Sequence, residues 1–255
     1  MASTETPKIT IHWLNYSRSH RIVWLLEELN LEYEIKLYKR GEDRLAPKEL
    51  RDLHPLGKSP LLEIQTPGRE KPLIIAESAF IVEYLTESFG KQMIPARFPE
   101  GKETIGFESE EWLRYRHLLH FAEGSFMPPL LIALMVGTIR DAPVPFFIKP
   151  VTKSIAQKIN DGFLSNQLKQ NFAFVESQVA SSPDAGEFLC GKSLTGADIM
   201  MIFPLQGAMS RGGLNAEEHP KTVAYVKRLE ERDAYKRGVQ KIVDLTGEPF
   251  SPVFQ

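Results

Sequence analysis

The chain has 255 residues, of which 42% are hydrophobic and 25% charged, a composition typical of a soluble globular protein with a sizeable core. Its 31 basic and 33 acidic side chains give a formal net charge of −2, which excludes an overall positive field, so we expect no nucleic-acid partner. Cys190 is the only cysteine, which excludes an internal disulfide, a CxxC redox pair and a zinc site made of several thiolates.

Predicted strands and helices alternate in the first third of the chain. Residues 8–14 alternate in part and contain β-branched side chains, which indicates a strand. Residues 17–29 place apolar side chains at i, i+3, i+4 and i+7, which indicates a helix, and residues 31–37 return to a period of two. The chain therefore begins as strand, helix and strand.

A predicted hairpin and a helix complete this region. The short apolar runs 60–64 and 73–76 flank a Pro67–Gly68 turn signal, which favours a pair of antiparallel strands. Residues 78–89 then have a helical pattern that stops at Gly90. The stretch before the hairpin is typical of a short helical or irregular connection.

From residue 91 the character of the sequence changes, because a polar, proline-bearing segment without periodicity follows. No convincing strand pattern appears after it. Helical patterns cover 107–136, 152–180, 195–210 and 220–243. We therefore predict two domains, an α/β domain at 1–91 and an all-α domain at 106–255.

The longest apolar run, Phe126 to Val136, contains two prolines and is far shorter than the roughly 20 residues that cross a bilayer, which predicts no membrane span. The first ten and last four residues match no targeting signal, so we expect a cytoplasmic protein. Thr195 and Asp198 match a variant capping box before a strongly apolar helix, and we assign this pair a structural role.

Polar residues lie at the ends of several predicted elements in the first domain. Ser17 follows the first strand, Ser59 and Pro60 precede the third, and Glu77 and Ser78 follow the fourth. The free amides of a helix that begins at Ser78 suit a carboxylate, and Glu77 suits an ammonium, so this pair fits an α-amino-acid end. Pro60 either simply begins a strand or forms a cis peptide that exposes the Ser59 backbone to a peptide ligand.

The order of elements and four motifs resemble the cytosolic glutathione transferases over roughly residues 8–240. The motifs are GKSPLLEI at 57–64, AES at 76–78, LTGADI at 194–199 and ERDAYKR at 231–237. The stretches NYSRSHRIVWLLEEL, RYRHLLHFAEGSFMPPLL and DAPVPFF look most like a fungal and bacterial, yeast-type subgroup. The resemblance implies a thioredoxin-like first domain that holds glutathione and a helical second domain that contributes the electrophile site.

The resemblance also implies roles for individual residues. It makes Pro60 a cis-proline and Ser59 the residue whose backbone pairs with the cysteinyl part of glutathione. It assigns Glu77 and Ser78 to the γ-glutamyl end.

For the glycyl carboxylate the candidates are Lys58 and His54, with Arg44 as a weaker one. Each of these three side chains could equally be a solvated loop residue.

The residue that activates the thiol stays open between several candidates. Serine-type members place a hydroxyl four residues before an arginine, and Ser17 with Arg21 keeps that spacing, so we expect Ser17 to be catalytic. Tyr16 matches the tyrosine-type members, and Asn15, Ser19 or a backbone amide could also reach the sulfur. Ser17 could also serve only as a helix N-cap.

The electrophile pocket is the least readable part of the site. Tyr115, Phe121, Phe126 and Met127 fall where the family lines this pocket, and Tyr16 is a further candidate. Aromatic and methionine side chains at helical spacing are, however, also typical of a helical core.

The resemblance implies a homodimeric glutathione S-transferase of the detoxification type, which conjugates the glutathione thiolate to small hydrophobic electrophiles and has a peroxidase side activity. Glutathione is the co-substrate, and no metal is expected, since His117 and His120 have no third ligand at helical spacing. One alternative is a non-catalytic binding module with a vestigial glutathione site. A thiol oxidoreductase is disfavoured, because serines occupy positions 17 and 19 where it needs a cysteine.

Overall fold

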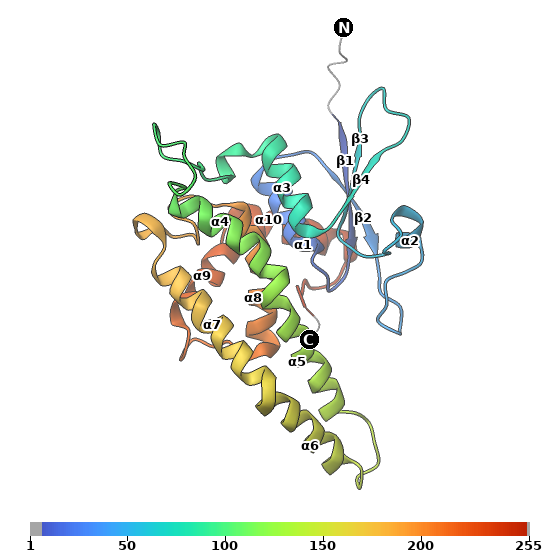
Figure 1. Cartoon of the computed structure of the whole chain (residues 1–255). Coiled ribbons are helices and arrows are strands. Elements are labelled where there is room, and N and C mark those ends of the chain that lie inside the picture. The colour runs from blue at the N-terminus through green and yellow to red at the C-terminus, as the bar shows by residue number, and fades with distance from the viewer. Residues whose placement is uncertain (1–6, 254–255) are drawn as a thin grey trace. The chain divides into compact units, whose positions relative to one another are not determined.

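The computed structural model describes residues 7–253, which divide into two compact units. The first unit runs to Ile94 and resumes at Arg228, and the second is Pro95–Lys227 (Figure 1). The predicted fold class, an α/β domain of thioredoxin-like type with an all-α domain, is confirmed.

The first unit contains a four-stranded sheet with strand order β2-β1-β3-β4. β1 and β2 are parallel, whereas β3 is antiparallel to both β1 and β4. The strands are β1 (Lys8–Leu14), β2 (Glu34–Tyr38), β3 (Leu61–Gln65) and β4 (Leu73–Ala76). The helical elements are α1 (Ser19–Glu28), α2 (Glu49–Leu53), α3 (Ser78–Phe89), η1 (Lys91–Met93) and α10 (Asp233–Thr246).

Helix α1 lies in the core of this unit. It packs against β1, α3 and α10, and residues Ser19 to Glu27 are all buried. A helix that is buried on nearly every side needs apolar residues around most of its circumference, which the run Ile22 to Leu26 supplies. The start of α1 is therefore held in a fixed position relative to the sheet.

Helix α10, near the end of the chain, packs in the first unit and not in the helical domain that the sequence pattern predicts. The pattern assigns everything after 106 to one helical domain, but α10 packs on α1 in the first unit. Arg232 also forms a bidentate ion pair with Glu28, at 2.6 and 2.8 Å. An amphipathic pattern shows that a helix has an apolar face, but it does not show which element covers that face.

Glu27 forms a second polar link between α1 and α10. Its carboxylate accepts hydrogen bonds from Tyr33 Oη at 2.6 Å, Arg237 Nε at 2.9 Å and Lys241 Nζ at 2.5 Å. Burial acts to raise the pKa of Glu27, but the hydrogen bonds from Lys241, Tyr33 and Arg237 outweigh it and lower that pKa. The carboxylate is therefore ionised and paired at neutral pH.

The second unit is helical, and apart from one bridge between Phe188 and Gly191 its described residues form no strand. Its first elements are α4 (Glu110–Phe121), η2 (Ala122–Phe126), α5 (Met127–Arg140), α6 (Lys149–Ile159) and η3 (Asn160–Leu164). The remaining ones are α7 (Ser165–Ala180), η4 (Pro183–Ala185), α8 (Gly196–Gly207), η5 (Ala208–Gly212) and α9 (Pro220–Glu230), which continues past Lys227.

Helices α4 and α5 are joined by a π-helical turn, η2, rather than by a loop. Pro129 has no amide hydrogen, so the carbonyl of Ser125 cannot receive an α-helical bond from it. That carbonyl instead accepts a hydrogen bond from Asn171 Nδ2 of α7 at 3.1 Å. The helix therefore continues through Pro128 and Pro129, with a π-helical turn just before them and a side chain of α7 bound to the carbonyl that Pro129 leaves without an α-helical donor.

The continuous helical segment Glu110–Arg140 corrects the expectation that no stretch is long enough to span a membrane. By length and composition it passes that test, with 28% of its most apolar window buried. Counting uninterrupted apolar residues missed it, because an apolar window tolerates scattered polar side chains. Length and composition alone do not distinguish a membrane span from a core helix of a soluble protein.

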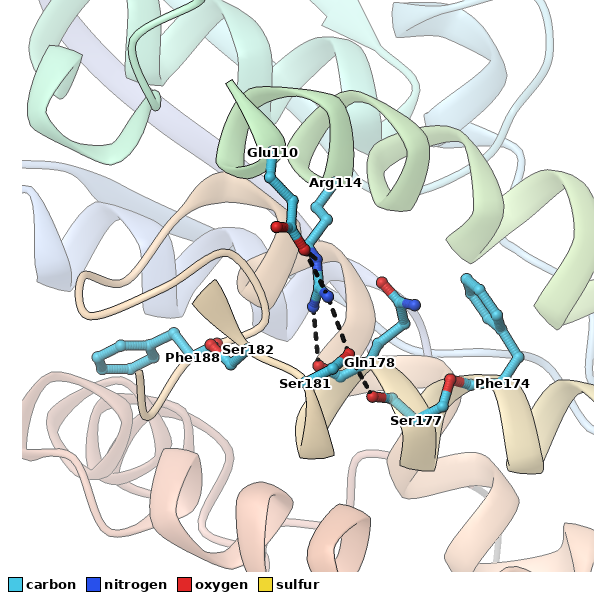
Figure 2. Close-up of polar contacts among 8 residues, drawn as sticks. All are labelled: Glu110, Arg114, Phe174, Ser177, Gln178, Ser181, Ser182 and Phe188. Carbon is cyan, nitrogen blue, oxygen red and sulfur yellow. Dashed lines mark hydrogen bonds and ion pairs between the residues drawn. The ribbon is translucent and has the colours of Figure 1, made fainter. Parts of the chain in front are cut away.

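Arg114 fixes α4 to the end of α7, as Figure 2 shows. Its guanidinium donates to Glu110 Oε1 at 2.9 Å, to the Gln178 carbonyl at 3.0 Å and to Ser181 Oγ at 2.9 Å. A cation is favoured at this place, because the last carbonyls of a helix carry a partial negative charge. Two helices distant in sequence are thereby joined by one side chain.

Asp198 organises the polar part of the helical core. Its carboxylate is fully buried and accepts from the amides of Leu189 at 3.0 Å and Thr195 at 2.8 Å. It also accepts from the hydroxyls of Thr195 at 2.8 Å and Tyr225 at 2.6 Å. The predicted capping box is thus confirmed in a structural role, with additional partners that the sequence did not reveal.

We expect Asp198→Ala to lower the free energy of unfolding by about 3 kcal/mol or more, since each buried donor left unpaired costs about 1–3 kcal/mol. Chemical denaturation followed by circular dichroism measures the change. The control is Asp161→Ala, an exposed position of the same unit, which should stay within about 0.5 kcal/mol of the wild type. A loss below about 1 kcal/mol for Asp198→Ala would contradict the role of this carboxylate.

We expect Glu27→Gln to lower the free energy of unfolding at pH 7 by about 1–3 kcal/mol. Because folding lowers the pKa of Glu27, its contribution is present above the ordinary value of 4.5 and is lost as pH falls through the folded value. The difference between wild type and variant should therefore shrink in acid, as measured by denaturation at several pH values. The control Glu34→Gln removes an exposed pair with Lys8 and should have little effect at any pH.

Candidate functional site

The pairing register of the sheet brings three segments of the chain to one end of it. Leu61, the first residue of β3, lies opposite His12 of β1 on one side and Ala76 of β4 on the other. The residues that follow β1, precede β3 and follow β4 therefore lie close together. These are the segments in which the sequence places its polar candidates.

The Ser59–Pro60 peptide bond is cis, as the sequence analysis predicted from the resemblance. Pro60 is buried and Ser59 is partly buried, just before β3 begins. The hydroxyl of Ser59 donates to the carbonyl of His12 in β1 at 2.8 Å. The segment before β3 is thus fastened to the central strand.

Glu77 and Ser78 lie where β4 passes into α3. Glu77 is exposed and has φ 72° and ψ 121°, a positive-φ conformation that costs a non-glycine residue energy. Ser78 is 5% exposed and is the first residue of α3, whose first amides have no partner within the helix. Backbone strain of this kind is concentrated at binding and catalytic sites, which supports a binding role for this turn.

Three serine hydroxyls form a chain that begins and ends at carbonyls of β1. The Ser17 hydroxyl donates to the carbonyl of Leu14 at 2.7 Å and lies 2.6 Å from Ser19 Oγ. Ser19 Oγ lies 2.5 Å from Ser59 Oγ, which donates to the carbonyl of His12. Each hydroxyl has one proton, so three protons are shared among four oxygen–oxygen contacts. One contact always lacks a proton, so Ser19 can donate either to Ser17 or to Ser59 while the other two hydroxyls keep their carbonyl acceptors.

The structure brings Ser17, Ser19 and Ser59 together. It also gives the candidates for thiol activation structural contacts of their own. Ser17 is 7% exposed, and its oxygen accepts from the amide of Ser19 at 3.2 Å, which is a local turn contact just before α1, whose N-cap is Arg18. Asn15 Oδ1 accepts from the Arg40 amide at 2.9 Å, which gives Asn15 a role in holding the loop. Tyr16 is partly buried with φ 50° and follows it directly.

The candidates for a carboxylate partner lie in the loop between α2 and β3. Lys58 is exposed, whereas His54 directly follows the last residue of α2 and its Nδ1 accepts from the Leu56 amide at 3.4 Å. Gly57 has φ 56°, and a Cβ there would approach the side chain of Arg51 to 2.3 Å, so this turn requires glycine. Arg44 is exposed in the preceding loop.

A buried histidine beneath the site was missed by the sequence analysis. His12 is 1% exposed, with Nδ1 3.0 Å from Tyr38 Oη and Nε2 3.1 Å from Glu63 Oε2. A neutral imidazole that donates to Glu63 and accepts from Tyr38 satisfies both contacts. Burial lowers the pKa of His12, and Lys36 adds to this, whereas the hydrogen bond and the charge of Glu63 act against it. The alternation of β1 indicates which residues share a face, but the register that joins these three strands is a long-range property.

The aromatic candidates for the electrophile pocket lie inside the helical unit. Tyr115, Phe121 and Phe126 are 2%, 8% and 0% exposed. The rings of Phe121 and Phe126 are stacked with centroids 5.7 Å apart, and Phe174 lies 4.9 Å from Phe121. Side chains buried in this way contact protein atoms, so we assign these three to the core and leave them out of the site that we propose. Met127 is 6% exposed, and we assign it to the core for the same reason.

His117 is part of the same aromatic cluster, with its ring 5.4 Å from that of Phe174. Within residues 7–253 no group of three or more His, Cys, Asp or Glu side chains is arranged to hold a metal ion.

The chain matches two family models, one described as the N-terminal domain of glutathione S-transferase, over residues 9–87, and one as its C-terminal domain, over residues 139–237. Glutathione S-transferase 1 of Saccharomyces cerevisiae is 37% identical over 235 residues, which cover 92% of this chain and 95% of that protein. Glutathione S-transferase 3 of Schizosaccharomyces pombe is 31% identical, over 96% of this chain and 92% of that protein.

Solved structures agree with these matches. A glutathione S-transferase from Actinobacillus pleuropneumoniae has a TM-score of 0.64 and 30% identity, over 91% of this chain and 92% of that one. A glutathione transferase homologue from Lodderomyces elongisporus, solved with two GSH per subunit, has a TM-score of 0.65 and 18% identity, over 91% and 97%. The latter likeness supports the fold.

We expect the imidazole of His12 to titrate below its ordinary value of 6.5, as measured by NMR. Glu63→Gln should lower the pKa of His12 further, and Lys36→Gln should raise it. Because the folded pKa is lower than the unfolded one, the contribution of the neutral imidazole to stability is present above about pH 6.5 and is lost as pH falls. Titration at or above 6.5 would show that the side chain is not held neutral by burial.

Proposed function

Because the chain belongs to the glutathione S-transferase family, we propose that it conjugates the sulfur of glutathione to small hydrophobic electrophiles. The observation that supports this most is the convergence of Ser17, Ser59, Glu77 and Ser78 at one end of the sheet. The glutathione bound in a relative of the same fold is consistent with it. Another relative was crystallised with 1-(S-glutathionyl)-2,4-dinitrobenzene, a conjugate of the proposed type.

In the proposed complex, the γ-glutamyl end of glutathione binds where β4 passes into α3. The carboxylate of Glu77 pairs with the α-ammonium, and the hydroxyl of Ser78 and the first amides of α3 bind the α-carboxylate. The backbone of Ser59 pairs with the cysteinyl part, with Pro60 fixing its approach. Lys58 or His54 binds the glycyl carboxylate.

The thiol is activated by stabilising its anion. A free thiol has a pKa of about 8.5, and lowering this by about two units requires about 2.7 kcal/mol. Ser17 supplies a charge-assisted hydrogen bond when its hydroxyl turns from the Leu14 carbonyl to the sulfur, and the N-terminus of α1 adds its partial positive charge. This turn leaves the Leu14 carbonyl without the Ser17 hydroxyl, so the charge-assisted bond to the sulfur has to be stronger than the neutral bond that is lost.

The chemical step needs no protein nucleophile. The thiol proton passes to solvent, and the thiolate forms a carbon–sulfur bond with the electrophile. In a substitution the leaving group departs with its electron pair, and in an addition the displaced electron pair takes up a proton from solvent. Peroxide reduction is a proposed side activity. We further propose a cytoplasmic homodimer with a detoxification role, in which residues 1–91 bind glutathione and the helical residues from 106 to 227 contribute the electrophile site.

We expect glutathione bound to the wild type to titrate about two units below its free value, and Ser17→Ala to return it by about one unit or more. The measurement is the pH dependence of thiolate absorbance, with Ser19→Ala and Tyr16→Phe titrated in parallel. Transferase activity at neutral pH should follow the thiolate fraction, and should therefore fall about threefold for the first unit by which the thiol pKa returns toward its free value and about eightfold for the second. A lowered pKa in wild type and Ser17→Ala alike would transfer the role to another donor.

Glu77→Gln provides the matched control for binding. It should weaken glutathione binding about tenfold or more, since a hydrogen bond to a charged group contributes about 1.5–3 kcal/mol, and it should leave the thiol pKa of the bound fraction unchanged. A wild type that does not bind glutathione in calorimetry would contradict the transferase and favour a binding module with a vestigial site.

A further inference from the structure

The chain continues beyond α10 in a short segment without helix or strand, residues 248–253, which we call the C-terminal strap. It belongs to the first unit, together with the sheet and α1. Helix α10 ends at Thr246, and Gly247 follows with φ 68°, a left-handed conformation that glycine adopts without strain. The strap therefore leaves the axis of α10 directly after the last turn of that helix.

One aromatic side chain of the strap packs on the second residue of α1. The ring of Phe250 meets that of His20 edge to face, with the centroids 5.5 Å apart and 67° between the ring planes. Phe250 is partly buried, whereas Glu248 and Pro249 before it are exposed. His20 is only 4% exposed, so its ring is enclosed by protein atoms, and Phe250 is part of that enclosure. Edge-to-face pairs of this kind add stability beyond the area that they bury, so the strap is docked on α1 by a specific contact.

His20 in turn contacts the backbone of the residue that we expect to activate the thiol. Its Nδ1 lies 3.3 Å from the carbonyl oxygen of Ser17. A carbonyl oxygen only accepts, so Nδ1 carries a proton and donates it. A hydrogen bond of this length is weak by itself, so the orientation of the imidazole depends on the side chains that pack against it. Phe250 is one of these, which connects the strap to Ser17 through a single side chain.

The loop between β1 and α1 contains a residue that needs such support. Tyr16 has φ 50°, a left-handed conformation that is costly for a side chain with a Cβ and persists only when the surroundings determine it. Arg40, which follows β2, donates from Nε to the carbonyl of Asn15 at 3.1 Å and from Nη2 to that of Tyr16 at 3.5 Å. With the bond from His20, three successive carbonyls at 15–17 are each bound by a side chain from outside this loop.

The strap also reaches the other support of this loop. Glu248 Oε1 lies 2.8 Å from Nζ of Lys39, the residue directly before Arg40. Both side chains are more than half exposed, so the pair contributes little to stability. Its position is nevertheless informative, because it places the strap beside Arg40 as well as on His20. The strap therefore spans the two groups that hold the loop in place.

We propose that the C-terminal strap positions the hydroxyl of Ser17 for the sulfur of glutathione, with Phe250 and His20 as positioning residues. Phe250 fixes the imidazole of His20, and the imidazole fixes the carbonyl of Ser17. This inference deepens the proposed function and rests on it, whereas the contacts of the strap do not.

The energetic reason lies in the small margin that favours the thiolate. When the Ser17 hydroxyl turns to the sulfur, it gives up its bond of 2.7 Å to the Leu14 carbonyl, so only the difference between the two bonds stabilises the anion. Ordering a loose backbone in the same step would take up part of that difference. A backbone that the strap has already fixed avoids this cost, which is the advantage of a donor that is positioned in advance.

The first test is hydrogen exchange of the whole purified chain without ligand, followed by mass spectrometry. Phe250→Ala should accelerate exchange in the segment 15–19 about two- to tenfold, because it removes the aromatic pair. Phe250→Tyr keeps the ring and should restore protection. The matched control is Leu245→Ala, a 52% exposed position of α10, which should leave this segment unchanged. Exchange in Phe250→Ala equal to that of the wild type would overturn the positioning role of the strap.

The second test is the thiol pKa of bound glutathione, measured by thiolate absorbance. Phe250→Ala and His20→Phe should each raise it by about half a unit or more, and glutathione affinity in calorimetry should stay within about twofold. His20→Phe retains a ring for Phe250 and removes only the donor to Ser17, so it tests the hydrogen bond separately. Unchanged thermal midpoints confirm that the variants fold, since a general loss of stability would not shift the thiol pKa alone.

The outcomes separate this inference from the proposed function. A wild type that lowers the thiol pKa, with both variants and Leu245→Ala indistinguishable from it, would overturn the positioning role and leave the transferase in place. An equal rise in Leu245→Ala would also overturn it, because the effect would not be specific to the strap. A wild type that binds glutathione without lowering its pKa would overturn the proposed activation of the thiol, and the positioning role with it.

Discussion

The backbone pairing of Leu61 with His12 on one side and with Ala76 on the other is the constraint on which the proposed site depends. It places the segments of Ser17, Ser59 and Glu77 at one end of the sheet, although they are far apart in sequence. A slip of one residue would turn every side chain of β3 to the opposite face and move the segment before it. The proposed glutathione site is therefore a property of strand register more than of any single loop.

A second layer of contacts holds the helix that begins at this end of the sheet. Glu27 and Glu28, at the far end of α1, bind basic side chains on or next to α10, so the last helix of the chain fixes the first. The start of α1 then has little freedom, which matters because a hydroxyl donor stabilises an anion only when its position is prepared in advance. Residues distant from the chemistry in this way determine its geometry.

Local signals in the sequence were sufficient to predict part of the fold and part of the proposed site. The helix start at Ser78 and the capping role of Asp198 depend on neighbouring residues, so the local sequence pattern indicated them. The cis bond before Pro60 was predicted from the family resemblance, because the residues alone left it open beside a plain strand start. The partners of His12 and the packing of α10 on α1 depend on register and tertiary contacts, which no local pattern encodes. Helical spacing likewise could not decide whether Phe121 and its neighbours face a core or a pocket.

The π-helical turn η2 determines how α5 responds to a change in chain length. It holds one residue more than an α-helical turn, and its wider winding absorbs that residue within about one revolution of the helix. Deletion of a single residue from Ala122–Phe126 would return the segment to the α-helical register, so Leu131, Met135 and Ile139 would keep nearly the same angle about the helix axis. In a regular α-helix the same deletion would rotate every following side chain by about 100°. The turn therefore makes the orientation of α5 tolerant of a one-residue change in length.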